Sequence, residues 1–171
     1  MSTFLTTAIE AAEDALANNA DFRTWCGASS AADAKANYIF SEDAVYGGDN
    51  LPDAYAVVSE IDDWEYPRVG EGAGSGNFLL SAGTFKITFQ EVLADGVDWT
   101  ATNRKAFKDF VFGQVQPFIS AYETYSGGGY RLMNVIKVPF EEDTYRLRVV
   151  FDDLGGRKGY MYVIEAQLGV L

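Results

Sequence analysis

Residues 104–122 read RKAFKDFVFGQVQPFISAY and carry the clearest helical pattern in the chain. Apolar side chains recur there at three- and four-residue steps, the spacing of one face of an α-helix. Arg104, Lys105, Lys108 and Asp109 hold the other side of the predicted helix. The predicted apolar stripe consists of Phe107, Phe110, Val111, Val115, Phe118, Ile119 and Tyr122.

The ends of this helix are predicted from its capping and breaking residues. We expect it to begin after Thr102 or Asn103, because both side chains can cap a helix. Pro117 lies inside the stripe. Because proline lacks a backbone donor, we expect it to kink the helix or to end it early. The Gly127-Gly128-Gly129 turn then stops the helical region.

A second amphipathic helix is predicted at the start of the chain. Ser2 or Thr3 can cap it, and it is expected to end near Asn18-Asn19. Its buried face is predicted from apolar positions at helical spacing. These positions are Leu5, Ala8, Ile9, Ala12 and Leu16.

The segment that follows has no sustained periodicity. Phe22 and Trp25 are expected to cover the exit of the first helix. Residues 26–50 are rich in Ala, Ser, Asp and Gly, so they are predicted to form an irregular surface insertion with a short helix at Ala31–Ala36.

A long β-hairpin is predicted between Tyr55 and Leu93. Apolar and polar residues alternate from Ala54 to Tyr66 and again from Phe78 to Leu93, which is the pattern of half-buried strands. Residues 67–77 between them are dense in glycine. Glycine adds conformational freedom and no side-chain packing, so this segment is expected to be a mobile hairpin tip.

Three further strands are predicted after the main helix, at Tyr130–Phe140, Thr144–Phe151 and Gly159–Leu168. The last two are expected to form a hairpin around the turn at residues 152–158. The predicted fold is α+β, in the order α-β-β-α-β-β-β, with two main helices packed on one face of an antiparallel sheet. The length of 171 residues predicts a single domain spanning 1–171.

Composition narrows the classes of function. The 13 basic and 25 acidic residues give a net charge of −12, which repels nucleic-acid phosphates and anionic lipids. We therefore expect no specific DNA binding and no membrane association. The first 20 residues contain no lysine or arginine, so no signal peptide is predicted, and the single cysteine permits no intramolecular disulfide. A cytosolic site of assembly is the resulting expectation.

The residues that most often perform catalysis are missing. Histidine is absent, which excludes Ser-His-Asp and Cys-His nucleophiles and imidazole metal sites. Cys26 beside Trp25 is predicted to be a small apolar core residue. The glycines of residues 70–76 do not satisfy a dinucleotide or P-loop pattern and join two strands, so they predict a hairpin tip and not a nucleotide site.

Three acidic clusters deserve a separate interpretation: residues 60–63, residues 141–143 and Asp152-Asp153. None has the alternating ligand pattern of a calcium-binding loop, so solvated turns are the favoured interpretation. We predict no metal, no cofactor and no catalytic residues. If the protein lines a channel, the summed negative field lets DNA pass without sticking.

With this order of elements, the chain resembles the tail terminator (tail completion) proteins of long-tailed bacteriophages. The resemblance is one of pattern and rests on no signature motif. It covers most of the chain but excludes residues 26–50. The segments that carry it are the helix at Thr3–Leu16, the hairpin from Tyr55 to Leu93, the helix at Arg104–Tyr122, and the strands from Val135 through Phe151-Asp152-Asp153 to Tyr162–Val170.

The resemblance implies a structural virion protein and not an enzyme. Proteins of that family form a ring, usually of six subunits, that caps the tail tube, stops its polymerisation and faces the head-side connector. Its implied partners are copies of itself, the tube protein and the connector protein, with DNA passing through the ring. Its implied location is the tail or neck of the virion, after assembly in the host cytoplasm. By position, the candidate interface residues are Gly70, Gly72, Gly74, Gly76, Asp152, Asp153, Arg157 and Lys158.

Self-assembly also has a purely physical argument, since a sheet leaves unpaired backbone groups on its edge strands unless something covers them. Two alternatives remain open. One is another neck, connector or minor tail subunit. The other is a small-molecule-binding α+β domain whose sheet and second helix enclose an aromatic pocket with carboxylates. A ring subunit is expected to have flat exposed edges, and a carrier is expected to be a monomer with a sizeable closed cavity.

Overall fold

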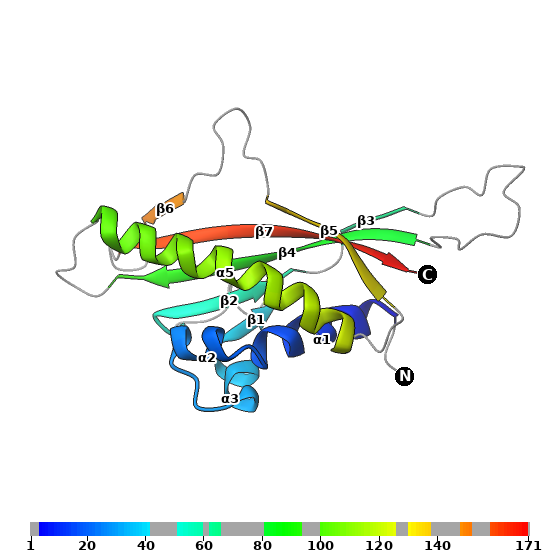
Figure 1. The fold of residues 1–171 in the computed structure, drawn as a ribbon, viewed down its shortest axis with the longest axis horizontal. Coiled ribbons are helices and arrows are strands. Elements are labelled where there is room, and N and C mark those ends of the chain that lie inside the picture. Colours follow the sequence, from blue (N-terminus) through cyan, green and yellow to red (C-terminus); the bar gives the residue numbers. More distant parts are fainter. Residues whose placement is uncertain are drawn as a thin grey trace, which may run out of the picture.

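A computed structural model describes residues 4–41, 51–59, 62–65, 81–93, 100–125, 130–137, 148–151 and 158–170. Helices and strands are mixed along these residues, which is compatible with the predicted α+β class (Figure 1). In chain order the elements are α1 (Phe4–Ala17), α2 (Ala20–Cys26), α3 (Ala31–Asn37), β1 (Ile39–Ser41), β2 (Ala54–Val58), β3 (Asp62–Glu65), β4 (Ser81–Val92), α5 (Ala101–Tyr125), β5 (Tyr130–Lys137), β6 (Arg148–Phe151) and β7 (Lys158–Val170).

The strands form one sheet around two long central strands. β4 and β7 pair antiparallel from Ser81 opposite Val170 to Val92 opposite Gly159. β2 and β3 lie beside β4, and β5 and β6 lie beside β7, all of them antiparallel to the central strands. The β2–β4 pairing agrees with the predicted hairpin between Tyr55 and Leu93, and the β6–β7 pairing agrees with the predicted C-terminal hairpin. The predicted mobile tip at 67–77 lies outside the described residues.

The predicted order of elements is wrong in the first half of the chain. The strand predicted at Ala54–Tyr66 is described as two strands, β2 and β3, which both pair with β4. Residues 26–50 are not an irregular insertion throughout, because α3 and β1 lie within them. The short helix expected at Ala31–Ala36 is confirmed by α3. β1 pairs parallel with β2, with Ile39 opposite Ala56, so the sheet is not wholly antiparallel. The connection at residues 42–53 has the length that a parallel pairing requires, and a three-residue strand is too short to show a periodicity in sequence.

α2 was also missed by sequence analysis. Its first turn is capped by Asn19, whose Oδ1 accepts the backbone N–H groups of Asp21 at 2.9 Å and Phe22 at 3.2 Å. Its last turn ends at Gly27, whose φ of 83° lies in the left-handed region that glycine adopts without strain. The two caps stabilise a seven-residue helix, which is too short to show an amphipathic pattern.

α5 begins earlier and ends later than its sequence predicts. Thr100 caps it, because its Oγ1 accepts the backbone N–H of Asn103 at 3.1 Å, so the predicted caps Thr102 and Asn103 already lie in the helix. Pro117 does not end the helix, which continues to Tyr125. Burial of Phe118 and Tyr122 on the far side of the proline offsets the cost of the missing backbone bond.

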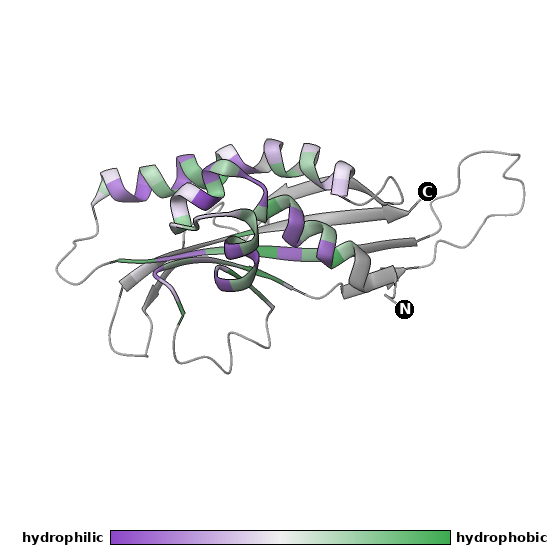
Figure 2. Ribbon diagram, turned by 90° about the horizontal axis from the view of Figure 1, so that it is seen from below, coloured by the Kyte–Doolittle hydropathy of each residue, from purple (hydrophilic) through white to green (hydrophobic). Residues whose placement is uncertain are grey.

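The core lies between the helices and one face of the sheet. α1 contacts α5 and β2, and α5 contacts β5 and β7, so both predicted main helices pack against the sheet. Figure 2 shows α5 running along one side of the sheet. In β4, Phe85, Ile87 and Phe89 are buried towards the helices, whereas Lys86 between them is exposed. This alternation is the one expected of a strand with one covered face.

Buried side chains confirm much of the two predicted stripes. In α1, Ala8, Ala12 and Leu16 are buried. In α5, Phe107, Val111, Phe118 and Tyr122 are buried, and Phe110 is half-buried. The Tyr122 hydroxyl donates to the carbonyl oxygen of Ala8 at 3.2 Å, which joins the two helices inside the core. Cys26 is buried as predicted, and burial raises the pKa of its thiol.

Candidate interaction site

The predicted interface residues fall almost entirely outside the described part of the chain. Gly70, Gly72, Gly74, Gly76, Asp152, Asp153 and Arg157 lie there. Lys158 is described only as the first residue of β7, where it pairs with Phe151. The two predicted interface segments are therefore not brought together by anything the structure describes.

An open cleft of about 460 Å³ lies between α2, the C-terminal end of β4 and the N-terminal half of α5. We call it the acidic aromatic cleft, because aromatic rings and carboxylates line it together. The side chains that give it this chemistry are Trp25, Asp53, Glu91, Asn103, Phe107 and Phe110.

Trp25 forms the centre of the aromatic wall. Its ring stacks on Phe110, with centroids 4.5 Å apart and planes at 18°. The rings of Phe107 and Phe89 lie 6.2 Å and 6.1 Å from it, within the range of favourable aromatic pairs. Since Phe89 and Phe107 are buried, the wall is anchored in the core and holds a defined position. The caps at Asn19 and Gly27 fix where α2, the helix that carries Trp25, begins and ends.

A hydrogen bond joins the aromatic wall to a carboxylate. The indole Nε1 of Trp25 donates to Glu91 Oε2 at 3.2 Å. Asp53 is held at the end of β4 through the backbone, because its carbonyl oxygen accepts the N–H of Val92 at 2.6 Å, and it lines the same cleft as Glu91. Glu91 is half-buried and Asp53 is exposed. The arrangement therefore presents negative charge next to apolar surface, which suits a group with a cationic head and an apolar stem.

Positive charge is concentrated on another side of α5. Arg104 and Lys105 are exposed, Lys108 is partly exposed, and Asp109 and Phe112 adjoin them around a shallow depression of about 420 Å³. We call Arg104, Lys105 and Lys108 the basic ridge. These three side chains form no salt bridge with any other residue that the structure describes. They agree with the polar side predicted for this helix.

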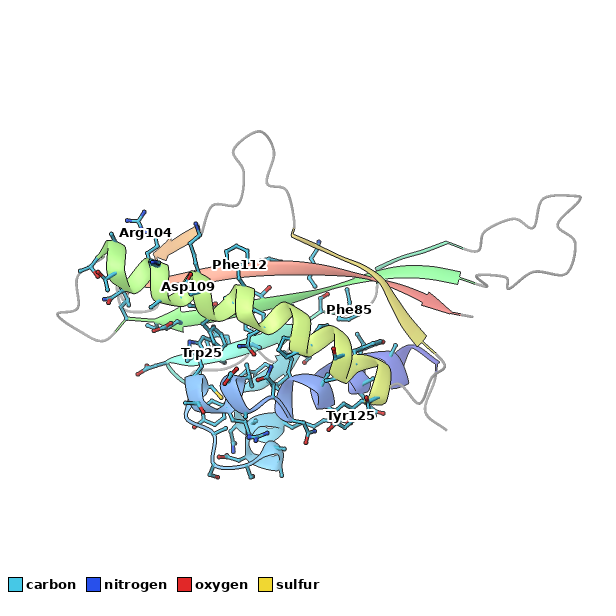
Figure 3. The ribbon with its side chains drawn as sticks, in the orientation of Figure 1. Trp25, Phe85, Arg104, Asp109, Phe112 and Tyr125 are labelled. Atoms are coloured by element: carbon cyan, nitrogen blue, oxygen red, sulfur yellow. The ribbon has the colours of Figure 1, made fainter. Side chains whose placement is uncertain are left out.

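The cleft and the ridge lie on opposite flanks of α5. An α-helix turns by about 100° per residue, so Asn103 and Phe110 lie on one flank of the buried stripe, and Lys105 and Lys108 lie on the other. Figure 3 shows the same separation, with Arg104 and Phe112 on the side of α5 away from Trp25. Neither surface can reach the other within one molecule.

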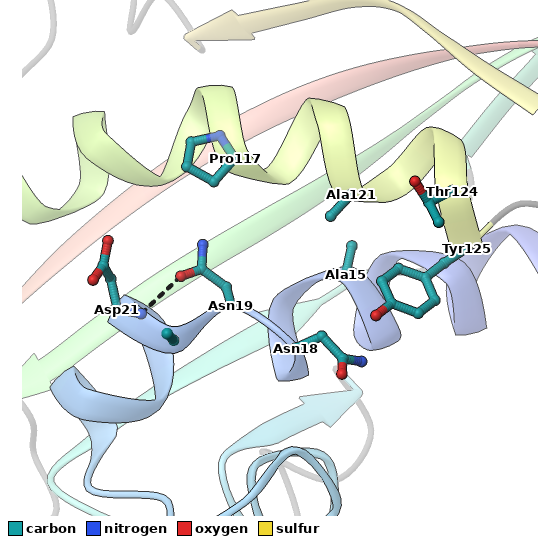
Figure 4. A pocket seen from close by; sticks show the side chains of 9 residues that line it. Ala15, Asn18, Asn19, Asp21, Pro117, Ala121, Thr124 and Tyr125 are labelled. Atoms are coloured by element: carbon teal, nitrogen blue, oxygen red, sulfur yellow. Dashed lines mark hydrogen bonds between the residues drawn. The ribbon is translucent and has the colours of Figure 1, made fainter.

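A second groove of about 430 Å³ lies where the end of α1 and the start of α2 meet the C-terminal half of α5 (Figure 4). Its walls include Ala15, Pro117, Ala121 and Tyr125, and 42% of Tyr125 is exposed. Its lining contains one carboxylate and no lysine or arginine. The groove therefore offers packing surface and little charge.

Three charged groups with altered pKa values, Glu13, Asp33 and Lys35, line neither the acidic aromatic cleft nor the depression at the basic ridge. Burial raises the pKa of Glu13, although Lys35 at 3.6 Å opposes the rise. The pKa of Lys35 is also raised: burial lowers it, but the hydrogen bond to Asp14 at 2.6 Å and the neighbouring carboxylates outweigh burial. Hydrogen bonds from the Ser29 backbone and side chain and from Asn37 lower the pKa of Asp33. Glu13 and Lys35 connect α1 with α3, whereas the hydrogen bonds of Asp33 stay within α3 and the residues just before it.

The acidic clusters singled out in the sequence do not form a described metal site. Asp62 and Asp63 lie in β3, whereas residues 60–61, 141–143 and 152–153 lie outside the described residues. Among the residues that the structure describes, no group of three or more His, Cys, Asp or Glu is arranged to hold a metal ion. Within the same residues, no helix is both long and apolar enough to cross a membrane.

Sequence analysis missed the acidic aromatic cleft because its residues come from four separate segments. Trp25, Asp53, Glu91 and Phe110 have no spacing that marks them as a set. Only the pairing of β2 with β4 and the packing of α2 on α5 bring them together. The chain was also compared with protein-family models and with curated protein sequences, and neither comparison found a match.

Proposed function

We propose that the chain is a non-catalytic structural subunit of a virion that assembles with copies of itself, as tail terminators of long-tailed bacteriophages do. In this role six subunits form a ring on the end of the tail tube. The ring stops polymerisation of the tube protein and offers a surface to the head-side connector. Assembly takes place in the host cytoplasm, and the ring then belongs to the tail or neck of the virion.

The observation that carries the proposal is the position of β5 at the end of the described sheet. This eight-residue strand pairs with β7 on one side, and no described strand pairs with its other side. A strand of that length with unpaired backbone groups is a template for another chain, so proteins cover such edges or pair them in assemblies. Contact between subunits in a ring provides a cover.

The charge of the chain is compatible with a ring through which DNA passes. A net charge of −12 makes non-specific adhesion of DNA to the ring unfavourable. The same charge opposes association of the subunits, so the contacts between them have to overcome a general repulsion. Assembly is therefore expected to depend on particular complementary surfaces.

A ligand-binding domain is the second candidate, and the acidic aromatic cleft is the observation that favours it. Its aromatic and carboxylate lining matches the pocket expected of a small carrier. The cleft is open to solvent, however, and a carrier that retains its ligand usually encloses most of the ligand surface. We therefore place this function second.

The test is the mass of the purified protein in solution, measured by light scattering with and without the candidate tube protein. A species of about six subunits, formed alone or only with the tube protein, is the expected result. A strict monomer in both conditions would contradict the proposal and favour the ligand-binding domain. A ring that does not stop tube growth in a polymerisation assay would instead indicate another neck, connector or minor tail subunit.

A further inference from the structure

We infer that the acidic aromatic cleft of one copy receives the basic ridge of the next copy. The inference rests on the proposed function, because it names the surfaces through which the subunits associate. It assigns a role to two described surfaces that the predicted interface did not include.

The cleft has the chemistry to bind a lysine or arginine side chain. Trp25 Nε1 donates a hydrogen bond to the carboxylate of Glu91, which holds that carboxylate at the aromatic wall. Asp53 adds a second carboxylate to the cleft. Phe107 and Phe110 supply apolar surface along the same cleft. Long basic side chains lay their methylene groups on such a surface and place their charge on the carboxylates.

The basic ridge is the matching surface on the same chain. Three of the 13 basic residues fall within positions 104–108, in a protein with 25 acidic residues. Two copies with a net charge of −12 repel each other over most of their surfaces. An attractive approach therefore has to use a patch where positive charge dominates, and the ridge is such a patch.

The placement of the two surfaces selects a second copy as the partner. They lie on opposite flanks of α5, so one molecule cannot satisfy its own cleft with its own ridge. Contact between two different patches of identical chains is heterologous, and each added copy leaves one cleft and one ridge free for the next. Repetition of this contact closes a ring when the rotation between copies permits it.

Charge reversal on each surface provides the test. One variant carries Asp53→Lys and Glu91→Lys in the cleft, and a second carries Arg104→Glu, Lys105→Glu and Lys108→Glu in the ridge. Each variant alone brings like charges together, so we expect assembly to need a protein concentration at least about tenfold higher than in the wild type. Lys86→Glu is the matched control, because Lys86 is exposed and lies outside both surfaces, and it should leave assembly unchanged.

Mixing the two variants gives the decisive measurement. The unaltered ridge of the cleft variant fits the unaltered cleft of the ridge variant, and the two reversed surfaces fit each other. We therefore expect an equimolar mixture to regain the wild-type assembled mass by light scattering, in whichever condition the wild type assembles. A single chain that carries all five substitutions should assemble with itself for the same reason.

The outcomes separate this contact from the proposed function. If the wild type assembles and reversal of the exposed ridge leaves assembly unchanged, the contact is wrong and the proposed function stands. If the mixture of folded variants fails to assemble, the pairing of these two surfaces is also wrong. A wild type that stays monomeric in every condition would overturn the proposed function and the contact together. Circular dichroism of each variant identifies a loss of folding, and the ridge variant alone still decides the question if the cleft variant does not fold.

Discussion

The side chain of Asn19 connects α2 with α5. Its Oδ1 caps α2, and its Nδ2 donates to Gln114 Oε1 of α5 at 2.6 Å. Gln114 is 2% exposed, so its amide relies on protein partners. The chain leaves α1 directly before Asn19, because α1 ends at Ala17. The residue therefore sets the direction in which α2 carries Trp25 to the cleft.

Two substitutions separate the functions of Asn19. Asn19→Ser keeps a good capping group but cannot reach Gln114, and we expect it to lower the free energy of unfolding by about 1 kcal/mol. Asn19→Ala loses both interactions and should lower it by about 2 kcal/mol. Urea unfolding measures both values. Equal losses in the two variants would show that the cap contributes nothing at this position.

Glu13 and Lys35 make stability depend on pH at the contact between α1 and α3. Burial raises the pKa of Glu13 above its ordinary value of 4.5, and Asp14 and Glu10 add to the rise while Lys35 opposes it. The folded state therefore binds this proton more tightly than the unfolded state does. Its contribution to stability is fully present below the unfolded pKa and is lost as the pH rises through the folded pKa.

We expect Glu13→Gln to remove this loss, so that the variant gains stability relative to the wild type as the pH rises from about 4.5. Urea unfolding across that range measures the difference. Lys35→Met is the companion variant, since it removes the attraction that keeps Glu13 ionised. The pKa of Glu13, followed by NMR of its carboxyl carbon, should then rise further. An unchanged or lower pKa in Lys35→Met would contradict the pairing.

At the scale of elements, the glycines in α5 and β7 differ in the space available for a side chain. Gly113 lies exposed inside α5, and an added Cβ there would meet no atom within 4 Å. Gly159 lies near the start of β7, where an added Cβ would be 2.6 Å from the backbone oxygen of Glu91 and 3.3 Å from Val92 Cα. The helix tolerates a side chain, whereas the close approach of β7 to β4 does not.

The same substitution should therefore have opposite effects at the two sites. Gly113→Ala is expected to raise the free energy of unfolding by roughly 0.5–1 kcal/mol, because alanine loses less conformational freedom in a helix. Gly159→Ala is expected to lower it by roughly 1–3 kcal/mol, because the backbone of β4 has to move. Thermal and urea unfolding check both. A neutral Gly159→Ala would mean that the end of β4 moves freely, and with it Glu91 in the cleft.

At the scale of the whole molecule, we expect the two central strands to resist local unfolding most strongly. β4 and β7 have neighbours on both sides, whereas β1 and β5 each pair with one described strand. We expect amide hydrogen exchange to be slowest in the paired middle of β4 and β7 and faster in β1 and β5, because edge amides open without disrupting the core. The measurement should be made at a concentration where the protein is not assembled.

Assembly should change this pattern in a way that locates the contacts. Slower exchange in β5 on assembly would indicate that its edge becomes covered, as the proposed function requires. Slower exchange in the first half of α5 would support contact at the cleft and the ridge. Equal exchange in β5 and β7 before assembly would show that β5 is already covered in the single chain.

The sequence by itself determined the mixture of helices and strands, the two main helices and several of their buried residues. Phe107, Val111 and Phe118 belong to a local periodic pattern. Such a pattern is visible in the sequence, because a helix with one buried face has apolar residues at three- and four-residue steps. The same holds for the alternation of Phe85, Ile87 and Phe89 in β4. The charged residues of the same segment likewise predicted the polar side of the main helix, with Arg104, Lys105 and Lys108.

Only the tertiary structure decided where β1 joins the sheet, that α5 continues through Pro117, and that Trp25 meets Glu91 and Phe110. Each of these depends on contacts between residues far apart in sequence. Short elements carry too few residues for a periodic signal, and the cost of a proline is outweighed by burial that only the packed state supplies. The acidic aromatic cleft belongs to this group, because no local property of its residues indicates that they share one surface.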